Sequence, residues 1–364
     1  MPILPIFRST GSHERRCSSL RQPGAGPLTQ KRAAGRANML LSNNASEWCS
    51  CAILAGTFLT LHIAGTTIAR ADEGGTAFWS SGQYTSLAAV PPTPGWSVSL
   101  SAYGYGGDTG ASKTLPIGGA LTLGAKQRSA TVSAQPGYAP DTALFGGQPF
   151  VGISFGLGGN RTEANVSILN SQIDRSDTFY AGSDLYPIAS IAWTRGTDNW
   201  MVYLTGDIPT GAYRASRLAN IGIGHGAIDA GGGYTYYDAK GGMEYSAVLG
   251  FTHNWKNKST DYRNGIDSHL DWAASRFVSP EWELGVAGYV YYQLTGDSGS
   301  GAILGPFKSH EAAVGPEIGY QFTAGGQQWQ ANVRIYWEFW AQNRFEGHAI
   351  FATLNVPLGG ATAK

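Results

Sequence analysis

Residues 329–340 read WQANVRIYWEFW, and this stretch decides the fold class. Side chains alternate between the two faces of a β-strand, so this strand has one apolar and one polar face. The apolar face carries Trp329, Ala331, Val333, Ile335, Trp337 and Phe339, and the polar face carries Gln330, Asn332, Arg334 and Glu338. Such a strand fits a soluble sandwich with the apolar face inward or an outer-membrane barrel with it outward.

The composition indicates many short strands rather than helices. Glycine accounts for 51 of the 364 residues and aromatic residues for 12%, while charged residues reach only 14%. A soluble domain usually has about a quarter of its residues charged. No apolar run is long enough for a membrane helix, so the low charge favours amphipathic strands separated by turns.

Residues 1–71 have the features of a basic leader followed by a signal peptide. Seven basic residues and one acidic residue lie within residues 1–38, and an apolar stretch then ends in ARA at 69–71. The stretch is shorter than a membrane helix, and ARA has the small-x-small form of a cleavage site. We expect a partly helical or disordered leader, export from the cytoplasm, and a mature chain that starts near Asp72. Either Met1 or Met39 could be the first residue.

Charge and cysteine content constrain the mature chain. Eight of the 25 basic residues and two of the 25 acidic residues precede residue 72, which leaves 17 basic and 23 acidic residues and a net charge of −6. An acidic chain argues against a nucleic-acid partner. Cys17, Cys49 and Cys51 all lie in the leader, so backbone pairing and burial must hold the mature fold together.

The second half of the chain alternates strands with connections of regularly changing length. Nine strands are predicted, at 185–195, 199–208, 230–239, 243–256, 266–278, 282–294, 310–323, 328–340 and 348–358. The connections are short at 196–198, 240–242, 279–281 and 324–327, and long at 209–229, 257–265, 295–309 and 341–347. Outer-membrane barrels alternate tight periplasmic turns with longer outer loops in this way.

Strand parity extends the prediction to the first half of the chain. Bacterial single-chain barrels have even strand numbers, so the first half must supply an odd number. We predict strands at 96–106, 119–134 and 145–158, and a long outer loop at 159–184. The result is an all-β fold, an antiparallel transmembrane β-barrel over 96–358 with about twelve strands, and a tail at 359–364. If TEANVSI at 162–168 also crosses the membrane as a strand, the even-number rule gives fourteen strands. The lower bound is ten strands.

The polar faces of the strands predict the lining of the lumen. The predicted lumen and substrate-pathway residues are Tyr203, Asp267, His269, Asp271, Glu283, Tyr289, Tyr291, Glu317, Arg334, Tyr336, Glu338 and Trp340. Aromatic faces beside carboxylates suit a flat, weakly polar solute. A structural explanation is also open, in which Arg334 neutralises Glu317 and the other residues hydrate the interior.

Residues 72–95 precede the first strand and form a possible lumen plug. Prolines cannot serve in a central strand, and the apolar residues of this segment need burial. The plug candidates are Phe78, Trp79, Leu87, Val90, Pro91 and Pro92. A periplasmic strap is the alternative.

Several phrases together resemble one family. They are GGTAFWSSGQYTSLAAVPPTPGWS at 74–97, DIPTGAYRASRLANIGIGHG at 207–226, STDYRNGIDSHLDWAAS at 259–275, YQLTGDSGSGA at 292–302 and VGPEIGY at 314–320. In this order they resemble the MetA-pathway of phenol degradation family of SphA-like outer-membrane β-barrel proteins. The resemblance implies a porin-like barrel of a Gram-negative bacterium that transports hydrophobic or aromatic compounds, and it supplies no catalytic residues.

We therefore predict an outer-membrane channel for passive uptake of small hydrophobic or aromatic compounds such as phenols. We expect outer-membrane lipid and these solutes as its partners, and no enzymatic activity. The histidines show no zinc-ligand spacing and no phosphate-binding loop occurs, so neither a metal nor a cofactor is expected. Two alternatives stay open: an outer-membrane hydrolase centred on His269, where Asp267 and Asp271 share its face, and a secreted all-β binding module.

Overall fold

The structure is a computed structural model that describes residues 73, 76–110, 114–117, 120–168, 171–303 and 305–359. The leader, the first mature residue and the tail from residue 360 lie outside the described residues. No helix in the described ranges is both long and apolar enough to cross a membrane. The strands are β1 Gly95–Asp108, β2 Thr114–Ile117, β3 Ala120–Ala139, β4 Gln148–Ile168, β5 Ser171–Gly182, β6 Tyr186–Arg195, β7 Asp198–Asp207, β8 Ala227–Asp238, β9 Met243–Asn254, β10 Ile266–Phe277, β11 Trp282–Gln293, β12 His310–Ala324, β13 Gln327–Gln342 and β14 Glu346–Pro357.

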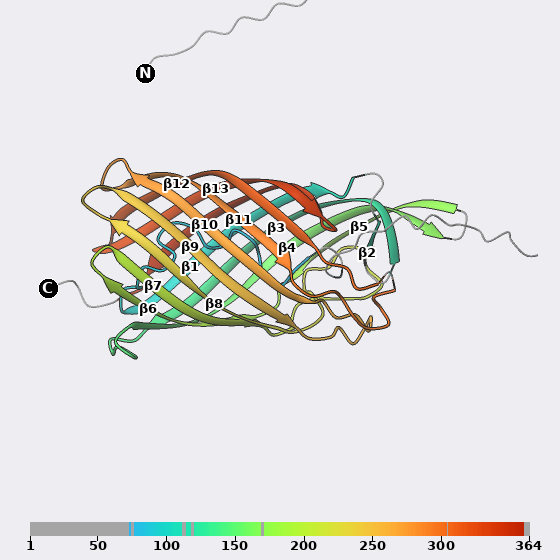
Figure 1. Ribbon diagram of the computed structural model, residues 1–364, viewed down its shortest axis with the longest axis horizontal. Helices are drawn as coiled ribbons and strands as arrows, with labels where there is room; N and C mark the ends of the chain where they lie inside the picture. The colour runs from blue at the N-terminus through green and yellow to red at the C-terminus, as the bar shows by residue number, and fades with distance from the viewer. Residues whose placement is uncertain are drawn as a thin grey trace, which may run out of the picture. The chain divides into compact units, whose positions relative to one another are not determined.

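Twelve of these strands close a ring, which confirms the predicted antiparallel barrel. The ring runs β1, β3, β4 and then β6 to β14 in chain order, and every neighbouring pair is antiparallel. The seam forms where β14 pairs with β1 from Ser97↔Pro357 to Asp108↔Glu346. Closure leaves no free edge around the ring, so the backbone groups of all twelve strands can pair (Figure 1).

The two ends of the barrel differ in their connections. Tight turns join β6 to β7, β8 to β9, β10 to β11 and β12 to β13, and we call this the turn end. The connections 208–226, 255–265 and 294–309 lie at the opposite end, which we call the loop end. One predicted long connection is much shorter than expected. It was predicted at 341–347 and comprises only residues 343–345, because β13 continues to Gln342.

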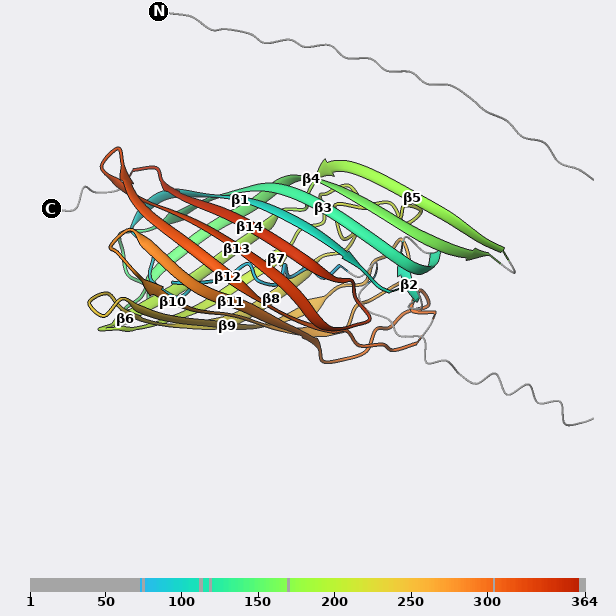
Figure 2. The same ribbon diagram turned by 90° about the horizontal axis from the view of Figure 1, so that it is seen from above.

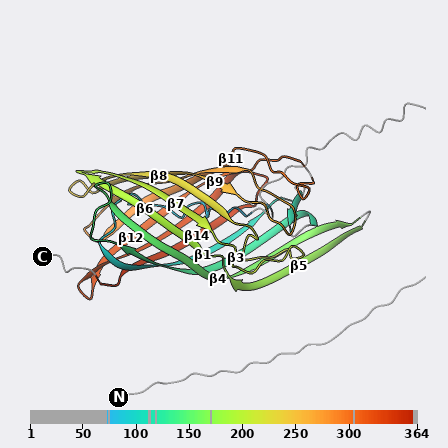
Figure 3. The same ribbon diagram turned by 90° about the horizontal axis from the view of Figure 1, so that it is seen from below.

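The predicted outer loop at 159–184 is wrong, because most of it is β-structure. Strand β4 continues to Ile168, and β5 returns along it, pairing Leu157↔Gly182 through Ile168↔Ser171. Strand β5 pairs with β4 alone and does not enter the ring, so the strand number stays at twelve. The β4–β5 hairpin projects beyond the other strands at the loop end (Figures 2 and 3).

The strands place their apolar residues on the outside of the barrel. In β9, Glu244, Ser246 and Val248 are buried inside, while Leu249 and Phe251 are about half exposed outside. In β13, Val333, Trp337 and Phe339 point outward and Arg334 and Tyr336 point inward. Aromatic pairs on the outer face lie toward the turn end, among them Trp96 with Tyr138 and Trp282 with Tyr320. An apolar outer surface with aromatic residues near its rim is the pattern of a lipid-facing barrel.

Trp340 departs from this alternation, and its predicted place in the lumen is wrong. Its φ angle is 59°, and the register between β12 and β13 shifts between His310 and Ala312. A bulge adds one residue to one strand and so reverses the face of the residues beyond it. Trp340 is accordingly 55% exposed and packs on the His310 ring at 4.2 Å, beside the outward Tyr292.

A charge at the middle of this outer face tests whether it meets lipid. We expect Val333→Arg to lower the free energy of unfolding in lipid vesicles by about 2–4 kcal/mol, because arginine is poorly tolerated at the bilayer midplane. Gln328→Arg, an exposed position near the turn end of the same strand on the side opposite to Val333, serves as the control. It should lower the free energy of unfolding by at most about 1 kcal/mol, because it does not face lipid. Equal effects in denaturant titrations would contradict a lipid-facing surface.

Candidate functional site

An irregular segment runs through the interior of the barrel. Residues 76–94, which we call the inserted segment, precede β1 and form no strand. Trp79 lies against His269, Gly82 against Asp271 and Ser86 against Ser275, so the segment descends along β10 from the loop end to the turn end. It leaves the interior where β1 begins, and Figure 1 shows it as the blue trace between the strands.

Inward side chains replace the backbone partners that a strand would have provided. The Asp271 carboxylate accepts hydrogen bonds from the N–H groups of Gly82 at 2.8 Å and Tyr84 at 3.1 Å. Arg334 donates to the carbonyls of Gly82 at 3.0 Å and Gln83 at 2.9 Å. A buried polar backbone group without a partner is costly, so these two charged side chains stabilise the turn.

The lower part of the inserted segment is held by β8 and β9. The N–H of Leu87 donates to Glu244 at 2.9 Å, and the N–H of Ala89 donates to the Thr235 hydroxyl at 3.0 Å. Ser86 donates to Ser275, whose hydroxyl lies within hydrogen-bond distance of both Glu244, at 2.9 Å, and Glu283. Glu244 and Glu283 therefore belong to one buried network under the segment.

Glu317 joins the same system from β12. It accepts a hydrogen bond from the Thr85 hydroxyl and another from the Asn332 amide. Asn332 also accepts a hydrogen bond from Arg334 at 3.0 Å, so Asn332 connects Arg334 to Glu317. The arrangement is more specific than simple charge neutralisation, because both charged groups also contact the inserted segment.

An aromatic cluster surrounds Trp79 in the half of the lumen nearer the loop end. The Trp79 ring stacks on His269 at 3.5 Å between centroids, and on Tyr203 and Tyr84 at 5.8 Å. His269 Nε2 lies 3.0 Å from Asp229, whose other oxygen accepts from the Tyr203 hydroxyl at 2.7 Å. The imidazole is buried and covered by an indole, so a bulky solute cannot reach it in this arrangement.

Contacts at the loop end hold Glu73, which precedes the inserted segment. Glu73 accepts hydrogen bonds from Tyr213 at 3.0 Å, Asn257 at 2.8 Å and Thr260 at 3.0 Å. Its N–H donates to Asn264 at 3.2 Å. These four residues come from the connections 208–226 and 255–265, so two connections at the loop end hold the same residue.

The other predicted lumen residues also lie inside the barrel. Tyr289 and Tyr291 are buried, and the Tyr289 hydroxyl donates to Glu338 at 2.7 Å. Glu338 also accepts from Tyr105 at 2.8 Å. Tyr291 lies under the Arg344 guanidinium at 4.1 Å. Asp267 is buried near the loop end, where the Asn254 amide donates to it at 2.7 Å.

The plug candidates differ in their degree of burial. Trp79 is 3% exposed, whereas Phe78, Leu87, Val90, Pro91 and Pro92 are half-buried. Phe78 packs on Tyr186 at 6.0 Å, and Leu87 adopts a φ angle of 62°. The segment thus lies in the lumen, and its action as a plug remains a prediction.

The inserted segment does not fill the lumen. It lies against β6 to β13, and a cavity of about 630 Å³ remains on its other side. Strands β1 and β3 contribute uncharged side chains to this cavity. They are Ser99, Ser101, Tyr103, Tyr105, Gln127, Ser129, Thr131, Ser133 and Gln135. The side chains of β1 and β3 therefore form a neutral wall along the free space. The charged side chains of Glu311, Arg334, Glu338 and Arg344 also line this cavity.

The sequence prediction missed this neutral wall as well as Asp229. Residues 127–135 place Gln, Ser, Thr, Ser and Gln at every second position, which is the signal of a polar strand face. Asp229 was assigned to a loop, because the predicted strand began at 230, whereas β8 begins at Ala227. Among the described residues, no group of three or more His, Cys, Asp and Glu is placed to hold a metal ion.

The connection 208–226 is fastened to the β4–β5 hairpin by an ion pair. Arg217 binds Asp177 through two hydrogen bonds, at 2.8 and 3.2 Å, and the Ala219 N–H donates to the same carboxylate at 3.2 Å. The hydrogen bond from Arg217 is the main cause that lowers the pKa of Asp177. The loop is thereby held beside the loop-end opening of the barrel.

The chain is similar to one protein family and to solved structures of outer-membrane proteins. A family model described as "Putative MetA-pathway of phenol degradation" matches residues 106–354. An outer membrane channel from Pseudomonas putida F1 is 12% identical, with a TM-score of 0.55 over 74% of this chain and 98% of that chain. A Pseudomonas aeruginosa FadL homologue is 7% identical, with a TM-score of 0.38 over 72% of this chain and 90% of that one. A search of curated proteins found no match.

A single added methyl group tests how the inserted segment is seated. Gly82 has a φ angle of +80°, and a Cβ there would lie 2.7 Å from Tyr336 and 2.9 Å from Tyr289. We expect Gly82→Ala to destabilise the seated position of the inserted segment by about 1–3 kcal/mol and so to displace the segment. A Ser86→Cys reporter, buried in the parent, should then react faster with a maleimide. Gly325→Ala has a similar φ of +60° in open space and should leave the rate unchanged.

The Asp177–Arg217 pair makes the attachment of the connection 208–226 dependent on pH. Folding lowers the pKa of Asp177 below 3.8, its value in the unfolded chain. The stabilisation that the ionised carboxylate gives to the loop is therefore complete above pH 3.8, and it is lost as the pH falls through the lower pKa of the folded state. We expect faster pepsin cleavage of 208–226 as the pH falls below 3.8. Arg217→Gln should remove that acid step and give fast cleavage at every pH tested; an unchanged profile would contradict the assignment.

Proposed function

Because the chain belongs to the family described as "Putative MetA-pathway of phenol degradation", matched over residues 106–354, we propose that it is an outer-membrane channel for passive uptake of small aromatic or hydrophobic compounds. The closed barrel with its apolar outer face supports the membrane location. The same outer face argues against a secreted binding module, which would bury those residues. The free cavity beside the inserted segment is the observation that carries the proposal.

The chemistry of the cavity supports a weakly polar aromatic solute. Tyr103 and Phe351 pack at 4.7 Å between centroids and line the cavity, as Tyr105 of β1 and Tyr186 of β6 also do. Hydroxyl and amide groups on β1 and β3 can hydrogen-bond a phenolic edge while rings stack on its face. Neutral polar groups bind such a solute weakly, which suits diffusion through a channel.

The inserted segment narrows the pathway in this proposal. The side chains that hydrogen-bond it come from five strands, β8, β9, β10, β12 and β13, and their loss would open the lumen to solutes that the present cavity excludes. The segment therefore serves as a filter that leaves one passage open, with neutral groups along its β1 and β3 side. Its many side-chain contacts make displacement costly, so the passage operates with the segment in place.

The hydrolase alternative is less well supported. A hydrolytic histidine needs a nucleophile within about 3.2 Å and access for the substrate. His269 instead contacts Asp229, Tyr203 and the Trp79 ring, and no serine hydrogen-bonds it among the described residues. The Tyr203 hydroxyl donates its proton to Asp229. This hydrogen bond is a structural contact inside the barrel and does not make the hydroxyl an activated nucleophile.

Blocking the free passage tests the channel directly. We expect liposomes with the mature chain to take up phenol faster than empty liposomes, and Ser101→Trp to slow that uptake severalfold. Ser101 lines the cavity, so an indole there occupies the passage. Ala102→Trp is the matched control, because the adjacent side chain points outward and should not change the uptake.

Parallel measurements with an alkyl alcohol and a sugar define the substrate class. Faster entry of phenol than of a sugar of similar size supports the proposed class. Loss of residues 76–90 should raise entry of all three solutes. The proposal fails if no solute enters faster than in empty liposomes, or if Ser101→Trp and Ala102→Trp behave alike.

A further inference from the structure

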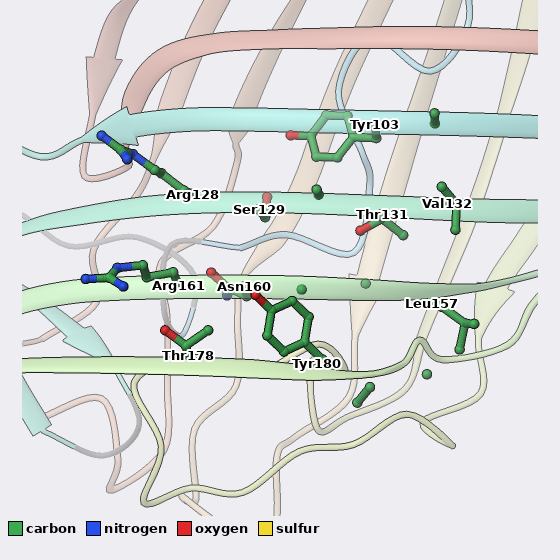
Figure 4. A pocket seen from close by; sticks show the side chains of 16 residues that line it. Tyr103, Arg128, Ser129, Thr131, Val132, Leu157, Asn160, Arg161, Thr178 and Tyr180 are labelled. Atoms are coloured by element: carbon green, nitrogen blue, oxygen red, sulfur yellow. The ribbon is translucent and has the colours of Figure 1, made fainter.

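A groove of about 850 Å³ lies on the wall of the barrel near the loop end, where β1, β3, β4 and β5 run side by side (Figure 4). Cross-strand pairing aligns Gly104, Ala130, Gly159 and Tyr180 in one row. The first three are small, so the outer surface is depressed over them. Tyr180 is 78% exposed, and its ring passes so close to Gly159 that a Cβ there would lie 2.5 Å away.

Two arginines border the groove on its loop-end side. Arg128 of β3 is directly opposite Arg161 of β4, and both are exposed. Side chains directly opposite each other in an antiparallel pair are about 5 Å apart at Cβ, and like charges there are destabilising. Arg161 is partly compensated by Glu163 on its own strand at 2.8 Å. Arg128 forms no ion pair with a described residue.

Apolar residues border the groove on its other side. One row closer to the turn end, Val132 and Leu157 are paired, and both are more than half exposed. The outward positions of β3 then continue as Ala134, Pro136 and Tyr138. On both strands the change from apolar to basic side chains occurs within two rows. Such a boundary is where the acyl region of a bilayer meets its headgroups.

We propose that this groove binds a phosphate-bearing lipid of the outer leaflet. Arg128 and Arg161 would bind the phosphate, since guanidinium groups form bidentate, charge-assisted hydrogen bonds with it. The small residues would accept the first part of an acyl chain, and Tyr180 would pack along it. An anion between the two arginines also removes their repulsion. This site rests on the proposed membrane location, and it is separate from the lumen.

Lipid retention in nanodiscs tests the site with the full mature chain. The discs contain phosphatidylethanolamine and a minor fraction of lipid A, either with both phosphates or dephosphorylated, and retained lipid A is counted by native mass spectrometry. We expect retention of the phosphorylated form alone. Arg128→Gln with Arg161→Gln should weaken it about fivefold for each arginine removed. Arg276→Gln, an exposed arginine of β10 at the turn end, is the matched control and should have no effect.

Two further arms separate the possible outcomes. Lysine at both positions should retain more lipid than glutamine, which excludes a folding defect as the cause. Competition by inorganic phosphate at millimolar concentration would show that the arginines recognise phosphate without the lipid, and would overturn the proposal. Equal retention of both lipid A forms in a barrel that inserts and takes up phenol would also overturn it. Failure to insert into the bilayer would instead overturn the membrane location.

Discussion

A chain that crosses a barrel interior without pairing as a strand must find partners for its backbone groups among side chains. This constraint explains the distribution of charge in the lumen. Asp271 accepts from the N–H groups and Arg334 donates to the carbonyls at the same turn. The carboxylates are therefore concentrated on the strands that face the inserted segment. The remaining wall, formed largely by β1 and β3, is lined by uncharged groups and borders the open space.

The strands and their order could be predicted because each prediction needed local information only. Strand β11 begins at Trp282 and ends at Gln293, against a predicted 282–294, since turn residues and period-two alternation mark both ends. The closed ring followed from parity and from the alternation of connection lengths. The same local pattern identified most inward residues from Tyr203 to Glu338.

Features that depend on distant contacts could not be predicted in the same way. The partners Gly82 and Asp271 are 189 residues apart, and the segment has no periodicity that would indicate them. Trp340 was misplaced because a bulge changes the face of a residue without changing the sequence alternation. Strand β5 was missed because it pairs with β4 alone, and most of it projects beyond the other strands with polar residues such as Asp174, Arg175 and Asp177 rather than an apolar alternation. The polar alternation of residues 127–135 was visible, and it was overlooked.

The path of the inserted segment has a consequence for biogenesis. Glu73 is bound by loops at one end of the barrel, whereas β1 begins at the other end and forms the seam with β14. A polypeptide cannot cross a closed sheet sideways. Either the sheet wraps around a segment already seated on β6 to β13, or the part of the chain before β1 is drawn through the finished pore. In the first route the segment acts as a template for closure of the barrel, so β1 and β14 are the last strands to pair.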